Sequence, residues 1–198
     1  MKKLVAMALA SMMVLSAVPV MAEEAGFEET PIGEEQDIII EGFAFTNEEG
    51  VETESGIHVA AVYFQPVQME PADQAGLSVE EANMHIEADI SANENCFGIG
   101  VGDWFPYLTV DYAVKDADGN VAVEGTFMPM SASDGPHYGA NINLPDAGTY
   151  TLTFTIHSPA ENGYLLHVDE ETGPGAQSLW NDPIVVDFEG WEYVPQEW

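Results

Sequence analysis

Three segments of the sequence carry side chains that are common ligands of transition metals. In the first, residues 84–90, the polar residues His85, Glu87 and Asp89 alternate with apolar ones. Alternate side chains of a β-strand share one face, so an imidazole is placed beside carboxylates. Ordinary solvent-exposed strands show the same alternation, so this segment needs further donors before it indicates a metal site.

The second segment adds a thioether and another imidazole. Met128 and Met130 project to one side of the chain, and the tight turn at residues 134–136 can return His137 toward Met130. Taken singly, a methionine is more often a packing residue, and a histidine after a turn is more often a surface residue. Met130 and His137 are therefore candidate ligands only if they converge with the first segment.

A carboxylate-rich loop supplies the third segment, in which His167 precedes Asp169 and Glu170. His58 and His157 lack such neighbours and lie in ordinary strand patterns. Structural roles are therefore predicted for His58 and His157, and three of the five histidines stay candidates for chemistry.

The chemistry of these donors depends on which of them converge, and spacing alone does not establish that. Imidazole with thioether suits copper, and imidazole with carboxylate suits iron, zinc or manganese. Cys96, the only cysteine, is expected to be a buried, inert thiol rather than a ligand. Ser131 and Ser133 lie near His137 in the sequence, but nothing around them indicates a base and an oxyanion hole, which argues against a hydrolase.

Short apolar and β-branched runs, separated by Gly, Pro, Asn and Asp, must position these residues. They predict strands at residues 36–43, 56–65, 83–91, 105–115, 121–128, 138–144, 149–157 and 183–189. Helical signals are scarce, which excludes a helical bundle. Residues 146–150 have the pattern of a tyrosine corner, in which a tyrosine hydroxyl binds nearby backbone. The sequence therefore predicts an all-β fold, namely an immunoglobulin-like β-sandwich.

The N-terminal residues have the order of a secretion signal. A basic start precedes an apolar run over residues 4–20, and Ala22 supplies a small residue for cleavage. Residues 1–22 are predicted to be a signal peptide, residues 23–35 a flexible acidic leader and residues 36–198 one metal-binding domain. No later apolar run is long enough to span a bilayer, so the mature chain is expected outside the cytoplasm without direct membrane insertion.

Acidic residues dominate the charge of the chain. Three Lys and Arg residues oppose 35 Asp and Glu residues, for a formal net charge of −32. Two of the three basic residues lie in the predicted signal peptide, which leaves Lys115. Nucleic acid and anionic membrane surfaces are therefore poor partners, whereas cations are attracted over a Debye length of roughly 8 to 10 Å.

Five longer stretches form an ordered series along the chain. They are IHVAAVYFQPVQMEP at 57–71, MHIEADISA at 84–92, WFPYLTVDY at 104–112, GTFMPMSASDGPHYGANI at 125–142 and HVDEETG at 167–173. In these stretches the chain resembles the periplasmic high-affinity iron transport family, whose members are described as ferrous-iron transport proteins and are encoded with an iron permease. The similarity spans nearly all of residues 35–190.

The resemblance implies more than the spacing does. It implies an immunoglobulin-like sandwich that forms homodimers in the periplasm, binds copper and carries iron as cargo for an inner-membrane iron permease. Asp89 and Glu170 are nearby acids that rank lower, for a second ion or for support of the ligands. The residues that correspond to the family's metal ligands are His85, Glu87, Met130, His137 and His167.

Three functions stay open for this sequence. The favoured one is a non-catalytic protein that binds copper and iron and delivers iron to a partner permease. The second is a copper-dependent redox protein that changes the oxidation state of iron before transport. The third is a secreted acidic module for calcium or carbohydrate, whose binding would survive the loss of His85 and His137.

Overall fold

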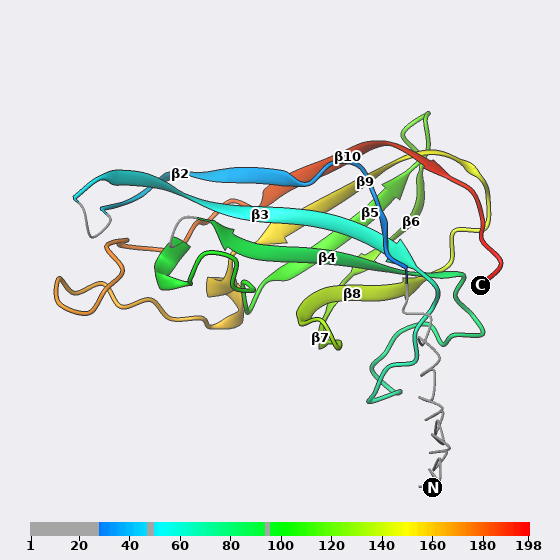
Figure 1. The fold of residues 1–198 in the computed structure, drawn as a ribbon, viewed down its shortest axis with the longest axis horizontal. Coiled ribbons are helices and arrows are strands. Elements are labelled where there is room, and N and C mark those ends of the chain that lie inside the picture. Colours follow the sequence, from blue (N-terminus) through cyan, green and yellow to red (C-terminus); the bar gives the residue numbers. More distant parts are fainter. Residues whose placement is uncertain (1–27, 47–49, 94–95) are drawn as a thin grey trace, which may run out of the picture.

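The strands form two antiparallel sheets (Figure 1). Alternating apolar side chains on successive strands build the interior between them. The structure, a computed structural model, describes residues 28–46, 50–93 and 96–198. The first sheet contains β1 (Thr30–Pro31), β2 (Gln36–Thr46), β3 (Glu52–Phe64), β4 (Met84–Asn93), β7 (Met128–Ser131) and β8 (Pro136–Ile142). The second contains β5 (Thr109–Lys115), β6 (Val121–Thr126), β9 (Gly148–His157) and β10 (Ile184–Tyr193).

The order of the strands brings distant parts of the sequence together. The first sheet runs β1-β3-β4-β8-β7, with β2 also paired to β3, and the second runs β10-β9-β5-β6. Two short 3-10 helices, Cys96–Gly98 and Pro159–Asn162, are the helical segments of the described residues. Within those residues no helix has the length and apolar character needed to cross a membrane.

Strand β4 shows how the sequence pattern makes the core. Ile86, Ala88 and Ile90 are at most 1% exposed and belong to the cluster of buried residues that both sheets share. Burial of each large apolar side chain contributes roughly 1.5 to 3 kcal/mol. These three residues therefore face the core, and the polar residues between them must lie on the other face of the sheet.

A tyrosine corner stabilises the entry into β9. The Tyr150 hydroxyl donates a hydrogen bond to the Asp146 carbonyl oxygen at 3.0 Å. This is the contact found in immunoglobulin-like sandwiches. The predicted all-β sandwich is confirmed.

All eight predicted strands have a counterpart, and the differences lie mainly at their ends. The strand expected from residue 105 begins at Thr109, because Tyr107 has a positive φ of 63° that interrupts an extended chain. The short strands β1 and β7 were not predicted, since neither is long enough to show a period.

The leader expected over residues 23–35 is ordered at its end. The predicted signal peptide and the leader up to residue 27 lie outside the described residues. From Thr30 to Pro31 the chain pairs with β3, and Ile32 is 1% exposed with its N–H bonded to the Ala61 carbonyl oxygen at 2.7 Å. Residues 30–32 of the predicted leader thus pair with β3 and reach the core through Ile32.

The connection between β3 and β4, residues 65–83, covers the outer face of the first sheet, and we call it the covering loop. Figure 1 shows it beside the start of β4 and the end of β8. The Asn141 side chain of β8 holds the loop, because its Nδ2 donates to the carbonyl oxygens of Val67 at 2.8 Å and Leu77 at 3.0 Å. The outer face of β4 is therefore buried at this end, where a solvated face would be usual for an antiparallel sheet.

Candidate metal centre

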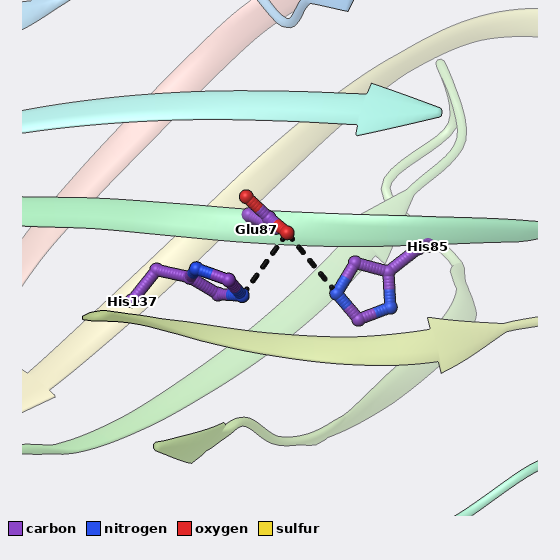
Figure 2. A group of neighbouring side chains, drawn as sticks. All are labelled: His85, Glu87 and His137. Atoms are coloured by element: carbon purple, nitrogen blue, oxygen red, sulfur yellow. Dashed lines mark ion pairs between the residues drawn. The ribbon is translucent and has the colours of Figure 1, made fainter. Parts of the chain in front are cut away.

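Two histidines and a glutamate meet under the covering loop, and we call them the His–Glu centre. His85 and Glu87 are alternate residues of β4, and His137 reaches them from β8 (Figure 2). Glu87 Oε1 lies 3.4 Å from His85 Nε2 and 3.0 Å from His137 Nε2. One ligand atom from each residue lies within 4.8 Å of the others. The side chains are 0 to 5% exposed, so their polar atoms have little access to water.

The two imidazole nitrogens that face Glu87 have no hydrogen-bond partner. His85 Nε2 and His137 Nε2 are buried without one, although a carboxylate oxygen is close to both. Unpartnered buried polar atoms carry a free-energy cost of about 1 to 3 kcal/mol each. A cation between the three side chains would satisfy both nitrogens and the carboxylate at once, so the residues present fit a transition metal.

The protonation of His85 is fixed by its other ring nitrogen. His85 Nδ1 lies 2.9 Å from Asn141 Oδ1, and Asn141 Nδ2 donates to two carbonyl oxygens of the covering loop. Because Nδ2 is used as a donor, Oδ1 must be the acceptor, so His85 carries its proton on Nδ1. Its Nε2 is left with a lone pair that points at the centre, as metal-binding histidines require.

His137 is held in the same way. It is hydrogen-bonded to the Gly135 backbone, and its unpartnered Nε2 leaves Nδ1 to make that bond. Burial lowers the pKa of His137 below 6.5, against the opposing effect of Glu87. His137 is therefore neutral at pH 7, which is the form that binds metal ions.

A glycine leaves room for the centre. Gly139 of β8 pairs with Glu87 of β4, and a Cβ added at Gly139 would lie 2.7 Å from His85 Nε2. No residue with a side chain fits there unless His85 moves. Gly139 thus keeps open the space beside the nitrogen that would hold an ion.

The His–Glu centre opens into a cavity of about 530 Å³. Met130 lines this cavity and is the direct cross-strand partner of His137, so the methionine predicted from the sequence lies beside the centre. Met69 of the covering loop and Phe64 of β3 line it as well.

Carboxylates around the cavity repel one another. Burial raises the pKa of Asp89 from 3.8 to about 7, and Glu87, Glu29 and Asp134 raise it further by their charges. Burial, followed by the charges of Glu87 and Asp134, also raises the pKa of Glu29. No Lys or Arg compensates, because Lys115 alone among the described residues is basic and it contacts Thr153 on the second sheet. A bound cation is the natural compensation for this charge.

His167 and Glu170 do not join the centre within one chain. His167 is exposed, its Nδ1 lies 2.8 Å from Thr172 Oγ1, and it lines a hollow with Phe97. Phe97 follows the end of β4, whereas His85 lies at its start, and ten residues of strand span roughly 30 Å. Of the five ligands implied by the resemblance, three therefore meet, Met130 lines the same cavity, and His167 is at the opposite end of the sheet.

The remaining histidines lie outside the cavity, as expected for structural residues. His58 Nδ1 is 2.9 Å from Asp37 Oδ1, and His157 Nε2 is 3.1 Å from Asp111 Oδ2. Each thus has its own carboxylate partner on the surface of a sheet. Cys96 is fully buried, and burial raises the pKa of its thiol to about 12, so it is an inert thiol as predicted.

Sequence reasoning missed three contributors to the site. Gly139 and Asn141 alternate with His137 on β8, so the same period-two rule that grouped His85 with Glu87 could have found them. Met69 lies in a loop without periodicity, and nothing in its neighbourhood marks it. The buried setting of the centre was missed too, because it depends on how the covering loop folds.

Comparisons with known proteins place this geometry in a family. Residues 26–195 match the family model described as Fe2+ transport protein. The chain is 41% identical over 189 residues, 93% of this chain and 84% of the relative, to the 34 kDa membrane antigen of Treponema pallidum (strain Nichols).

Solved structures agree with the sequence comparisons. FetP of uropathogenic Escherichia coli strain F11 is 42% identical, with a TM-score of 0.68 over 87% of this chain and all of that one. The copper-reconstituted P19 protein of Campylobacter jejuni is 40% identical, with a TM-score of 0.69 over 83% of this chain and 96% of that one. The resemblance seen in the sequence is thereby confirmed, and the chain belongs to the Fe2+ transport protein family.

Proposed function

We propose that this protein binds copper at the His–Glu centre, with Met130 as a further ligand, and carries iron for high-affinity uptake through an inner-membrane permease. It would act in the periplasm after cleavage of its signal peptide. The observation that carries the proposal is the pair of buried Nε2 atoms, unpartnered and aimed at one carboxylate. Copper-bound structures of FetP and P19 variants support the choice of metal.

The chain's own groups prepare the centre for a metal. Asn141 and the Gly135 backbone hold the imidazole protons on the outer nitrogens, so two lone pairs face inward. Glu87 supplies a negative charge between them. The three side chains are at most 5% exposed beneath the covering loop, which strengthens the charge interactions between them. Copper bound there would supply a site of one-electron chemistry, because imidazole, thioether and carboxylate together suit both of its common oxidation states.

Copper(II) titration of the metal-free protein beside His137→Ala tests the proposal. Wild-type protein should bind one ion tightly at the centre, and the variant should lose that binding. His157→Ala is the matched control, since His157 also faces a carboxylate but lies outside the cavity. Equal binding by all three proteins would mean that the acidic surface holds the ion, and it would contradict the proposal that copper binds at the His–Glu centre.

His167 extends the proposal to a homodimer. It is exposed and remote from the centre of its own chain, so it is free to approach the centre of a second copy. We therefore propose that a second subunit supplies His167 as the fifth ligand. His167→Ala should then weaken copper binding in the dimer while leaving the Nε2 pair intact. Sedimentation that shows a monomer with full copper affinity would contradict this arrangement.

A redox role is the second candidate, and the mixed donor set favours it. The carboxylates Glu29, Asp89 and Asp134 beside the centre are suited to ferrous or ferric iron, which prefer oxygen ligands. Stopped-flow mixing of copper-loaded protein with ferrous iron and oxygen should then show oxidation faster than with metal-free protein. Equal rates would leave binding and delivery as the whole function.

A further inference from the structure

Three of the four methionines of the described residues gather beside the His–Glu centre. Met69, Met128 and Met130 line one hollow of about 250 Å³, and we call these three residues the methionine site. Met69 and Met130 also line the cavity that contains the centre. The two hollows therefore adjoin, because Met69 and Met130 line both of them.

The fold brings these side chains together from two elements. Met128 and Met130 are alternate residues of β7 and are half-buried, whereas Pro129 between them is exposed. A Cβ added at Gly76 would lie 3.6 Å from Met128 Cε, which shows that the covering loop packs against this face. Met69 belongs to the same loop and completes the hollow.

Core packing accounts for only part of this arrangement, because Met128 packs against the core whereas Met69 and Met130 lie outside the core cluster. Met84, the fourth methionine, is fully buried in the core, as a packing residue is expected to be. The other three are partly open to solvent beside Glu70, which lines both hollows. Thioethers are soft ligands that select Cu(I) and bind hard cations poorly. A half-open group of three next to a copper centre is therefore suited to a cuprous ion.

We propose that the methionine site binds Cu(I) and passes it to the His–Glu centre, with Met130 as a ligand at both positions. The proposal rests on the proposed copper function. Transfer is an exchange of ligands: thioethers of Met69 and Met128 leave as imidazole nitrogens bind, and the oxidation state of the ion does not change.

Anaerobic competition for Cu(I) against a chromophoric chelator tests the methionine site. His137→Ala should still bind a cuprous ion, because the methionine site is intact. Adding Met69→Leu and Met128→Leu should weaken its Cu(I) affinity at least about tenfold, or 1.4 kcal/mol. Met84→Leu, the same change in the core, should not alter the affinity. X-ray absorption of Cu(I)-loaded His137→Ala should show thioether sulfur ligands that the leucine substitutions remove.

The outcomes separate this proposal from the function on which it rests. Leucine preserves volume at half-buried positions, and circular dichroism verifies that each variant is folded. Unchanged Cu(I) affinity after both leucine substitutions, or no Cu(I) binding by His137→Ala, overturns the methionine site alone. Retention of tight copper(II) binding by His137→Ala would instead overturn the His–Glu centre.

Discussion

Individual residues of the centre are held by partners that the sequence shows only in part. The alternation in β4 predicted that His85 and Glu87 share a face, and they do. It did not predict which nitrogen of His85 is free, because that depends on Asn141, which is 56 residues away. Ligand types can thus be predicted from a strand pattern, whereas their protonation requires the contacts between strands.

Gly139→Ala tests the space beside His85. The added methyl group would lie 2.7 Å from His85 Nε2, so the imidazole must leave its present position beside Glu87. Copper(II) affinity should fall by about 10- to 100-fold, the range typical of disturbed metal-site support. Gly125→Ala is the control, because its methyl group would approach the Tyr112 hydroxyl at 2.6 Å, outside the cavity. If Gly125→Ala reduces copper affinity as much as Gly139→Ala, the effect is one of general destabilisation.

Asp89→Asn tests whether the repulsion between the carboxylates destabilises the metal-free protein. The pKa of the Asp89 carboxyl in the wild-type protein, about 7, exceeds the usual 3.8, so the folded protein favours its protonated form. The resulting stability is present below about pH 3.8 and is lost as the pH rises through 7. At pH 8 the asparagine variant of the metal-free protein should be more stable by up to about 4 kcal/mol, and at pH 4 nearly equal.

Urea unfolding at both pH values measures this difference. Asp182→Asn removes an exposed acid and is the control for net charge. Equal stabilisation by the two substitutions would show that the total charge of the chain matters and the position of Asp89 does not.

At the scale of elements, long periodic segments were predictable and short or irregular ones were not. The eight strands follow from apolar runs and alternation, and in β4 and β9 the apolar residues of the pattern are buried. β7 has four residues, and its place is fixed by pairing with β8. The covering loop has no period at all, so no sequence rule placed it over β4, and the burial of the centre could not be foreseen.

Tyr150→Phe tests the tyrosine corner. The substitution removes the hydroxyl that binds the Asp146 carbonyl oxygen, so the free energy of unfolding should fall by about 1 kcal/mol. Copper affinity should not change, because β9 belongs to the other sheet. Tyr107→Phe, at an exposed tyrosine, should have little effect on urea unfolding. Equal losses of unfolding free energy in the two variants would contradict a specific stabilising role of the tyrosine corner.

In the whole molecule, the net charge affects how metal ions approach the His–Glu centre. The length of the sandwich determines which of the candidate ligands one chain can supply to it. The formal net charge of −32 produces a field that attracts cations from every direction. The sandwich also separates the centre from the loop that bears His167, which lies at the other end of β4. The resemblance implies His167 as a ligand, and only the fold shows that His167 lies far from the other four candidates of the same chain.

The rate of copper(II) association should therefore depend strongly on salt. Between low ionic strength and 1 M sodium chloride, screening should slow association by about tenfold or more while the number of bound ions stays the same. Stopped-flow fluorescence of the metal-free protein measures the rate. A rate independent of salt would mean that the overall charge does not steer metal ions to the centre.

The Asn141 amide couples the position of the covering loop to the protonation of His85 in the centre. If the loop lifts, Asn141 Nδ2 loses the Val67 and Leu77 carbonyl oxygens, and the amide can rotate. A rotated amide offers an N–H to His85 Nδ1, and the imidazole accepts it only by moving its own proton to Nε2. After the loop lifts, His85 Nε2 would carry a proton and could not bind an ion. The centre is therefore competent to bind an ion only while Asn141 holds the covering loop, which ties metal binding to the closed position of the loop.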